Sequence, residues 1–361
     1  MTLLLFILIL VVLILVHEFG HFIVAKLFGI RVDEFGIFFP PRVTAVTRGE
    51  TTYSLNWLPF GGFVRIFGES AGEGGADSRS FANQPRLVQA AVVVAGIACN
   101  LLFAWLVLGG GYLVGLPTSV EHRGFGTVID AKVMVVNVLP GSPAEKAGLA
   151  AGDIIESVET GGAQETQDAD AAATTEFISA HQEESLILMV DRDGVQQTFL
   201  AKAAADIVPD KKVIGVELDD VGILRLPPHL ALIQGAILGW DITRTTASGL
   251  MAFFVQLFTG TANLAGVAGP IGITAFGAAA IKQGVAAAIV LTALISINLA
   301  LINIIPIPGL DGGRLLIIAV EALRGRPLSP GLLTKLTMAG FALLIALMVI
   351  VSYHDIARLV G

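Results

Sequence analysis

Three ionisable residues interrupt an otherwise apolar opening stretch of the chain. Residues 2–16 carry no charge, and His17, Glu18 and His21 then follow in what still has the composition of one helix. Each such side chain is costly in hydrocarbon unless it pairs, binds an ion or does chemistry. An H-E-x-x-H spacing on a helix brings two imidazoles onto one face, where they can share a Zn²⁺, with the glutamate beside the metal as a general base for water. The stretch therefore predicts a zinc site at membrane depth, although the same spacing also arises by chance in soluble helices.

The third protein ligand of such a site must come from elsewhere, because catalytic zinc usually has three protein ligands and one open position. Asp311 is the candidate, at the end of a proline-interrupted apolar segment and in an expected glycine-flanked loop. Asp33 and Glu34 are nearer in sequence but fall beyond the expected helix end. An aspartate beside two glycines is also a common turn residue, so spacing alone favours Asp311 without excluding the others.

The composition is that of an integral membrane protein with a soluble insert. Of the 361 residues, 54% are hydrophobic and 14% are charged, against a charged fraction of about 25% in soluble domains. The mean hydropathy is +0.78. The first segment lacks the basic start and small-residue cleavage site of a signal peptide and is expected to be retained. Four transmembrane helices are predicted, at about 2–28, 87–116, 285–305 and 332–352.

Charge is distributed unevenly along the chain. Residues 118–230 contain nineteen Asp/Glu and eight Lys/Arg, so the net charge of this block is −11. The rest of the chain has a net charge of +3, which gives the total of −8. A basic nucleic-acid-binding surface is therefore not expected. Residues 26–86 hold seven Lys/Arg and residues 306–335 hold four, which by the positive-inside rule makes both cytoplasmic. The N-terminus and the acidic block should then be extracytoplasmic.

Two other segments carry β and loop signals before the second apolar stretch. Residues 43–67 are rich in β-branched and aromatic side chains, with a turn at 48–50 and with Gly61 and Gly62 as hinges, and they predict a hairpin followed by a strand. Such strands could lie against the helices at membrane depth or form a cytoplasmic surface hairpin. Residues 68–80 are rich in Gly, Ser and acidic residues and predict a flexible loop.

Small and polar residues mark the remaining apolar segments. Gly96 and Asn100 stand four apart, which suits either close helix packing or a role near the metal. Residues 229–258 contain Asp241 and Arg244 and predict an amphipathic helix at the membrane surface, with a fifth transmembrane helix as the alternative. Residues 266–273 predict a turn or re-entrant element.

The acidic block has a pattern of its own. Residues 131–157 (AKVMVVNVLPGSPAEKAGLAAGDIIES) predict a strand, a turn, a short helix from Ala144 to Ala147 and a second strand, and later strands are expected at 186–190 and 198–201, joined at Asp193 and Gly194. This pattern resembles a bacterial PDZ domain, with its core at 124–205. The resemblance implies that an extended peptide or chain terminus binds by strand addition at a sheet edge.

The whole chain resembles the site-2 protease family of intramembrane zinc metalloproteases, in its bacterial branch with an inserted PDZ domain. The matching motifs are HEFGH at 17–21, GGFVRIFGE at 61–69, AGPIGI at 268–273 and NLALINIIPIPGLDGGR at 298–314. The resemblance implies that His17, His21 and Asp311 bind zinc and that Glu18 is catalytic. It further implies that Asn298 and Asn303 help to hold the substrate, and that the strand containing Gly61 and Gly62 pairs with an unwound substrate.

The expected fold is a polytopic α-helical membrane protein with about four transmembrane helices, a membrane-associated β-hairpin and an inserted extracytoplasmic α+β PDZ-like domain. Its expected parts are residues 1–117, 118–228, 229–284 and 285–361, which are the first membrane half, the PDZ-like domain, an interfacial helix with a connector, and the second membrane half. Only one PDZ pattern is present, whereas bacterial members of the family often carry two.

The function implied is zinc-dependent peptide hydrolysis in the bacterial inner membrane, with the active site toward the cytoplasmic side. Its expected substrates are single-span membrane proteins already trimmed on the outside, such as anti-sigma factors or remnant signal peptides. The alternative is a PDZ-based membrane peptide receptor or chaperone with a non-catalytic metal site.

Overall fold

The computed structural model describes residues 2–69, 77–161, 170–192, 194–208, 211–261 and 269–360. The chain divides into two compact units, one formed by residues 1–109 and 235–361 and the other by residues 110–234. The candidate site residues all lie in the first unit.

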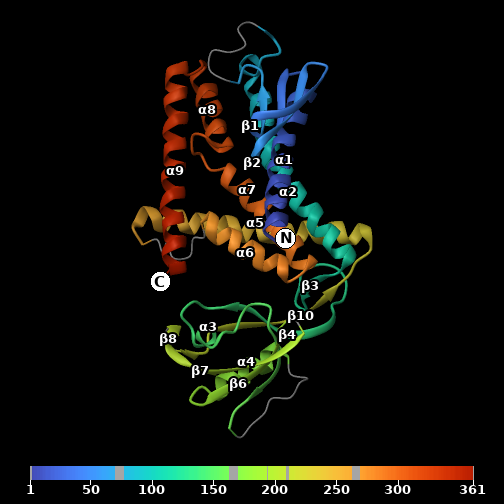
Figure 1. Ribbon diagram of the computed structural model, residues 1–361, viewed down its shortest axis with the longest axis vertical. Helices are drawn as coiled ribbons and strands as arrows, with labels where there is room; N and C mark the ends of the chain where they lie inside the picture. Colours follow the sequence, from blue (N-terminus) through green and yellow to red (C-terminus); the bar gives the residue numbers. More distant parts are fainter. Residues whose placement is uncertain are drawn as a thin grey trace. The chain divides into compact units, whose positions relative to one another are not determined.

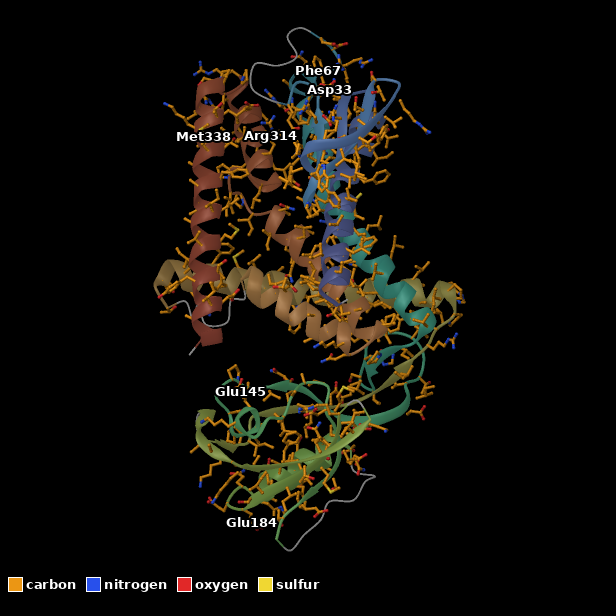
Figure 2. All side chains as sticks on the ribbon, viewed as in Figure 1. Asp33, Phe67, Glu145, Glu184, Arg314 and Met338 are labelled. Atoms are coloured by element: carbon orange, nitrogen blue, oxygen red, sulfur yellow. The ribbon has the colours of Figure 1, made fainter. Side chains whose placement is uncertain are left out.

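Four helices of the described chain are long and apolar enough to cross a membrane, which makes this a polytopic membrane protein (Figure 1). Their residues are mainly Leu, Ile, Val and Ala, so a 26-residue helix, about 39 Å long at 1.5 Å per residue, spans the hydrocarbon. Apolar side chains cover their outer surfaces, and Met338 on the last helix is 67% exposed (Figure 2). The four are α1 (Thr2–Leu27), α2 (Arg86–Val114), α7 (Val285–Asn303) and α9 (Pro330–Val360).

The hairpin region is larger than the predicted 43–67. Strand β1 runs over Val32–Arg48 and β2 over Thr51–Ile66. The first half of β1 pairs on one side with the start of β2, as in Phe35 with Tyr53, and on the other with its end, as in Phe35 with Val64. Each long strand therefore bends back on itself, and together they form a curled sheet of four segments. The sequence placed the start of the sheet too late, because the charged residues near position 33 have the composition of a loop. In the structure Glu34 is buried and paired with arginines.

The connection between α7 and α9 also differs from the expected loop. Residues Asp311–Arg324 form helix α8, and Asp311 is its first residue rather than part of a glycine-flanked loop. The glycines after it belong to the first turn of α8, where they allow close packing. A glycine pair beside an aspartate is ambiguous in the sequence because turns and close helix contacts both favour it.

Two further helices precede α7 in the chain. Helix α5 (Pro228–Thr259) is 32 residues long but is not among the four apolar spans. Helix α6 (Pro270–Lys282) begins inside the segment predicted as a turn or re-entrant element, so residues 270–273 are helical, and residues 266–268 lie outside the described chain. Figure 1 shows α5 and α6 crossing the view, whereas α1 and α9 run along it.

Close contact between α1 and α2 sets up the site. A Cβ on Gly20 of α1 would overlap the main chain of Ala95 and Gly96 on α2, so only glycine allows this approach. Further along α2, Ala104 and Leu108 pack with Ala293 and Ile297 of α7. Three helices from distant parts of the chain are thereby held side by side.

The second unit is an α+β domain built on one six-stranded sheet of order β3-β10-β4-β5-β6-β7. Ser142 caps the short helix α3 by accepting from the Glu145 amide, and Gly148 ends it at a φ of 96°. Arg192 holds Asp153 through two hydrogen bonds of 2.6 and 2.7 Å. The predicted Asp193 turn position lies outside the described residues.

The remaining elements are short. They are η1 (Phe81–Asn83), β3 (Leu116–Ser119), β4 (Ile129–Val138), α3 (Pro143–Ala147), β5 (Ile154–Glu159), α4 (Ala171–Ala180), β6 (Ser185–Arg192), β7 (Val195–Lys202), β8 (Ala204–Val208), β9 (Lys211–Val213) and β10 (Val216–Leu224).

Candidate metal centre

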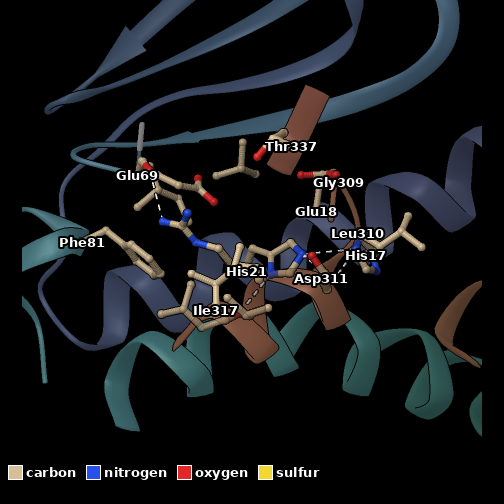
Figure 3. Close-up of a pocket in the computed structure, with 15 residues that line it drawn as sticks. His17, Glu18, His21, Glu69, Phe81, Gly309, Leu310, Asp311, Ile317 and Thr337 are labelled. Atoms are coloured by element: carbon tan, nitrogen blue, oxygen red, sulfur yellow. Dashed lines mark hydrogen bonds and ion pairs between the residues drawn. The ribbon is translucent and has the colours of Figure 1, made fainter. Parts of the chain in front are cut away.

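His17, His21 and Asp311 meet at one point although 290 residues separate the last two in sequence (Figure 3). The Nε2 atoms of the two histidines are 3.1 Å apart. Asp311 Oδ2 lies 3.1 Å from His17 Nε2 and 3.4 Å from His21 Nε2. Together these side chains are the group of His, Cys, Asp and Glu that could hold a metal ion within the described part of the chain.

The donor set fits tetrahedral zinc. With bond lengths of 2.0 to 2.1 Å, two ligand atoms of a tetrahedral zinc lie about 3.3 Å apart, close to the three separations observed. Asp311 Oδ2 is buried without a hydrogen-bond partner among the described residues despite its closeness to both rings. The three atoms are thus arranged as one face of a tetrahedron, which leaves a fourth position for water or substrate.

Helix α2 holds the two imidazoles from behind. His21 Nδ1 lies 2.9 Å from the carbonyl oxygen of Val92, and because a carbonyl can only accept, this nitrogen must carry a proton. His17 Nδ1 lies 3.2 Å from Asn100 Nδ2. Between these contacts, a Cβ on Gly96 would overlap His21 Nε2 and would lie 2.9 Å from His17 Cε1. Positions 92, 96 and 100 form one stripe along α2 that receives both rings.

The first turn of α8 presents Asp311. A Cβ on Gly312 would overlap the carbonyl of Ile304, and a Cβ on Gly313 would overlap that of Ile307, so the turn packs directly on the preceding backbone. A carboxylate at a helix N-terminus is favoured by the helix dipole. Burial raises the pKa of Asp311, but the closeness of His17 and His21 outweighs this and lowers it to about 2. The carboxylate is therefore ionised at neutral pH.

Glu18 faces the same cavity. A cavity of about 280 Å³ is lined by the three candidate ligands, Glu18, and residues from β2, α2, α8 and α9. A smaller neighbouring cavity of about 250 Å³ is also lined by His17, Glu18 and Asp311. Space for a substrate group therefore exists on the side of the candidate ligands where the glutamate stands (Figure 3).

The other predicted site residues differ in where they lie relative to Glu18 and the two cavities. A Cβ on Gly62 would lie 3.8 Å from Glu18 Cγ and 3.2 Å from Leu15, so this strand passes beside the glutamate. Gly61 adopts a φ of 140° and contacts Phe39 instead. Asn303 lines the smaller cavity with Glu18. Asn298 lies on α7, half-buried, and is not among the residues lining either cavity.

Several lining residues were not predicted from the sequence. Arg314 donates to the carbonyl oxygen of Glu69 at 3.1 Å, and its guanidinium lies 5.4 Å from the centroid of the Phe81 ring. Thr337 of α9 closes another side of the cavity. Glu69 belongs to the GGFVRIFGE motif, but nothing in the motif shows which way its side chain faces. The sequence did single out Asn100 by its spacing of four residues from Gly96, but this spacing suits helix packing and a role near the metal equally.

Comparison with known proteins gives a consistent result. The model of peptidase family M50 matches residues 5–347. A Clostridium perfringens (strain 13 / Type A) protein, provisionally named a zinc metalloprotease, is 32% identical over 345 residues, 95% of each chain. The zinc metalloprotease RasP of Shouchella clausii (strain KSM-K16) is 28% identical over 432 residues, 99% of each chain. The chloroplastic membrane metalloprotease ARASP of Arabidopsis thaliana is 31% identical over 327 residues, 88% of this chain and 70% of that protein.

Proposed function

Because this chain belongs to peptidase family M50 and is a zinc metalloprotease of the site-2 type, we propose that His17, His21 and Asp311 bind its zinc and that Glu18 is its general base. The observation that carries the proposal is the triangle of donor atoms, 3.1 to 3.4 Å on a side, in a cavity that Glu18 also lines. Both the spacing in the sequence and this geometry support the proposed roles of these four residues.

Each residue then has a defined task in peptide hydrolysis. Zinc in such a site polarises the scissile carbonyl and makes water a nucleophile near neutral pH. Glu18 takes the proton from the attacking water and later gives it to the leaving amine. Asn303, in the neighbouring cavity, can donate its amide to the oxygen that becomes negative in the transition state. Glu18 is not itself one of the proposed ligands.

A substrate helix must unwind before it can react, because its carbonyls are engaged in i to i−4 hydrogen bonds. The last segment of β2, residues 62–66, pairs with β1 on one side only among the described strands. Its other edge can take an extended peptide by strand addition. Since Gly62 lies beside Glu18, a peptide added at this edge would run past the proposed zinc ligands.

We propose that the substrates are single-span membrane proteins already trimmed outside, such as anti-sigma factors or remnant signal peptides. The membrane-embedded family supports membrane proteins as the substrate class. The excess of Lys and Arg in residues 26–86 and 306–335 supports a cytoplasmic position for the hairpin and α8. The site then opens toward the cytoplasmic side of the bacterial inner membrane and the second unit is extracytoplasmic.

For the second unit we propose a PDZ-like role in binding an extended peptide or chain terminus. In its sheet, β3 pairs only with residues 221–224 of β10, so residues 216–219 have a ladder partner on the β4 side alone among the described strands. Helix α4 packs against β10, and the Ala171 amide donates to Asp220 at 3.0 Å. A free strand edge beside a helix is the arrangement that peptide recognition by strand addition requires.

Replacing Glu18 by Gln tests the catalytic proposal against a peptide receptor with a non-catalytic metal site. We expect cleavage of a model single-span substrate to fall by roughly 10² to 10⁴, the usual contribution of general acid–base catalysis. Zinc content should stay at the wild-type value, because the side chain is replaced by one of equal size and is not a proposed ligand. Cleavage at the wild-type rate by Glu18→Gln would instead support the receptor.

A further inference from the structure

The two imidazoles of the candidate metal centre are held by different kinds of partner. His21 Nδ1 faces the Val92 carbonyl at 2.9 Å, which can only accept. His17 Nδ1 faces the carboxamide of Asn100, which can donate through nitrogen or accept through oxygen. Asn100 is fully buried, and its Nδ2 lies 3.2 Å from His17 Nδ1. Its Oδ1 is buried without a hydrogen-bond partner among the residues that the structure describes.

The carboxamide of Asn100 can serve either tautomer of His17. Its nitrogen donates to an unprotonated Nδ1, and its oxygen accepts from a protonated Nδ1. The other ring nitrogen, Nε2, faces the candidate metal position, 3.1 Å from Asp311 Oδ2 and 3.1 Å from His21 Nε2.

Zinc binding requires the tautomer of His17 with its proton on Nδ1. A ligating Nε2 must present its lone pair, so the single proton of a neutral His17 must be on Nδ1. The carboxamide fits the same space in either orientation. With Oδ1 toward Nδ1–H, both atoms have a partner, whereas Oδ1 otherwise has none among the described residues.

We propose that Asn100 is a positioning residue whose carboxamide oxygen accepts from His17 Nδ1–H and so stabilises the zinc-binding tautomer of His17. Outer partners of this kind typically raise metal affinity 10- to 100-fold. The inference rests on the proposed ligand role of His17, and Asn100 touches neither substrate nor metal.

Ser296 offers a matched control at the same place. Its Oγ donates to the main-chain oxygen of Asn100 at 2.8 Å, and it is also fully buried. Ser296→Ala therefore disturbs the same turn of α2 without removing the group that faces His17. A packing role for Asn100 would make the two positions equivalent, whereas a role toward zinc would not.

The test measures zinc dissociation constants of the full-length protein by competition with a chromophoric chelator at one pH. We expect Asn100→Leu to weaken zinc binding about 10- to 100-fold. Asn100→Asp, which can only accept from Nδ1–H, should bind zinc as well as wild type or better, and Ser296→Ala should match wild type. Equal zinc affinity in Asn100→Leu and wild type, or equal weakening in Asn100→Leu and Ser296→Ala, would overturn the proposal.

A second measurement determines the tautomer of His17 directly. Ring ¹⁵N chemical shifts distinguish protonated from unprotonated nitrogens, and the His17 signals are those that disappear in His17→Gln. We expect a larger share of the Nδ1–H tautomer in zinc-stripped wild type than in zinc-stripped Asn100→Leu. Equal shares in the two proteins would contradict the proposal. Failure of the catalytic proposal is read separately, from cleavage by Glu18→Gln.

Discussion

Asp311 shows how one residue depends on its neighbours for its chemistry. Its carboxylate reaches both histidines because Gly312 and Gly313 let the first turn of α8 pack on backbone carbonyls. Asp33, which the sequence also offered, instead pairs with Arg31 at 2.7 Å. Glu34 pairs with Arg42 at 2.7 Å. The three carboxylates are thus separated by what each one contacts.

Asp311→Asn should therefore lose zinc, while Asp33→Asn should keep it. The amide removes the negative charge from the proposed ligand set, so we expect the zinc dissociation constant to rise by at least the 10- to 100-fold typical of losing an outer partner. Metal content after dialysis against a defined free-zinc buffer measures both variants. Equal zinc content in the two would show that Asp311 is not a ligand.

Gly96→Ala should damage the site by space alone. The new Cβ would overlap His21 Nε2 and lie 2.9 Å from His17 Cε1, with both rings held on α2. We expect zinc content and cleavage to fall together. Gly110→Ala on the same helix meets no atom within 4 Å, and should keep zinc while leaving stability equal or up to about 1 kcal/mol higher. A Gly96→Ala protein with full zinc and activity would refute the proposed ring positions.

At the scale of elements, the curled β1–β2 sheet depends on a buried carboxylate. Glu34 is 5% exposed, 2.7 Å from Arg42 and 3.8 Å from Arg65. Burial raises the pKa of Glu34, but hydrogen bonds from Ser54 and Arg42 and the charges of both arginines outweigh it, so the pKa is lowered. The ionised side chain therefore joins β1 to the two parts of the sheet that flank it.

The β1–β2 sheet should consequently weaken in acid. Since the pKa of Glu34 is lower in the folded sheet than in the unfolded chain, its contribution is complete above the ordinary glutamate value of about 4.3 and is lost as the pH falls through the folded value. Hydrogen-exchange protection factors of β1–β2 amides, corrected for intrinsic rates, measure this. Glu34→Gln should lower the protection factors at pH 7, and they should then fall less steeply in acid than those of wild type. Protection factors that fall as steeply in Glu34→Gln as in wild type would rule Glu34 out as the cause.

At the scale of the whole molecule, the chain consists of two compact units with different tasks in our proposal. The site residues all belong to the unit formed by residues 1–109 and 235–361, and the six-stranded sheet belongs to the other. The sheet extends to β3 and β10, so removing only residues 124–205 would leave β10 without its partner β4. Excision must therefore include the entire sheet.

Replacing residues 116–226 with a Gly/Ser linker should preserve zinc binding and relax substrate choice. If the second unit excludes substrates with bulky external domains, the variant should cleave untrimmed and trimmed single-span substrates at similar rates. The ratio of the two rates, with Glu18→Gln in the same background as the blank, is the measurement. A ratio unchanged from wild type, in a variant that retains zinc, would exclude the filter.

Local physical chemistry makes much of this protein readable from its sequence. The apolar runs predict the membrane helices because hydrocarbon tolerates few charges, and the charges placed inside the first run predict chemistry for the same reason. The spacing of His17 and His21 places them on one helix face without any tertiary information. The alternation and turn residues of the second unit likewise predict its main strands and α3.

Contacts between distant segments were decided only by the tertiary structure. Three features depend on segments that meet across 80 to 320 residues of chain. They are the choice of carboxylate beside the histidines, the contact of Asn100 with a ring rather than with a packing neighbour, and the positions of Glu69 and Thr337 at the cavity. The start of the sheet at Val32 is another such feature. Glu34 can be buried in a strand there because the folded-back strands bring Arg42 and Arg65 close to it. Spacing along the chain determines what lies on one face of an element, but packing determines what that face meets.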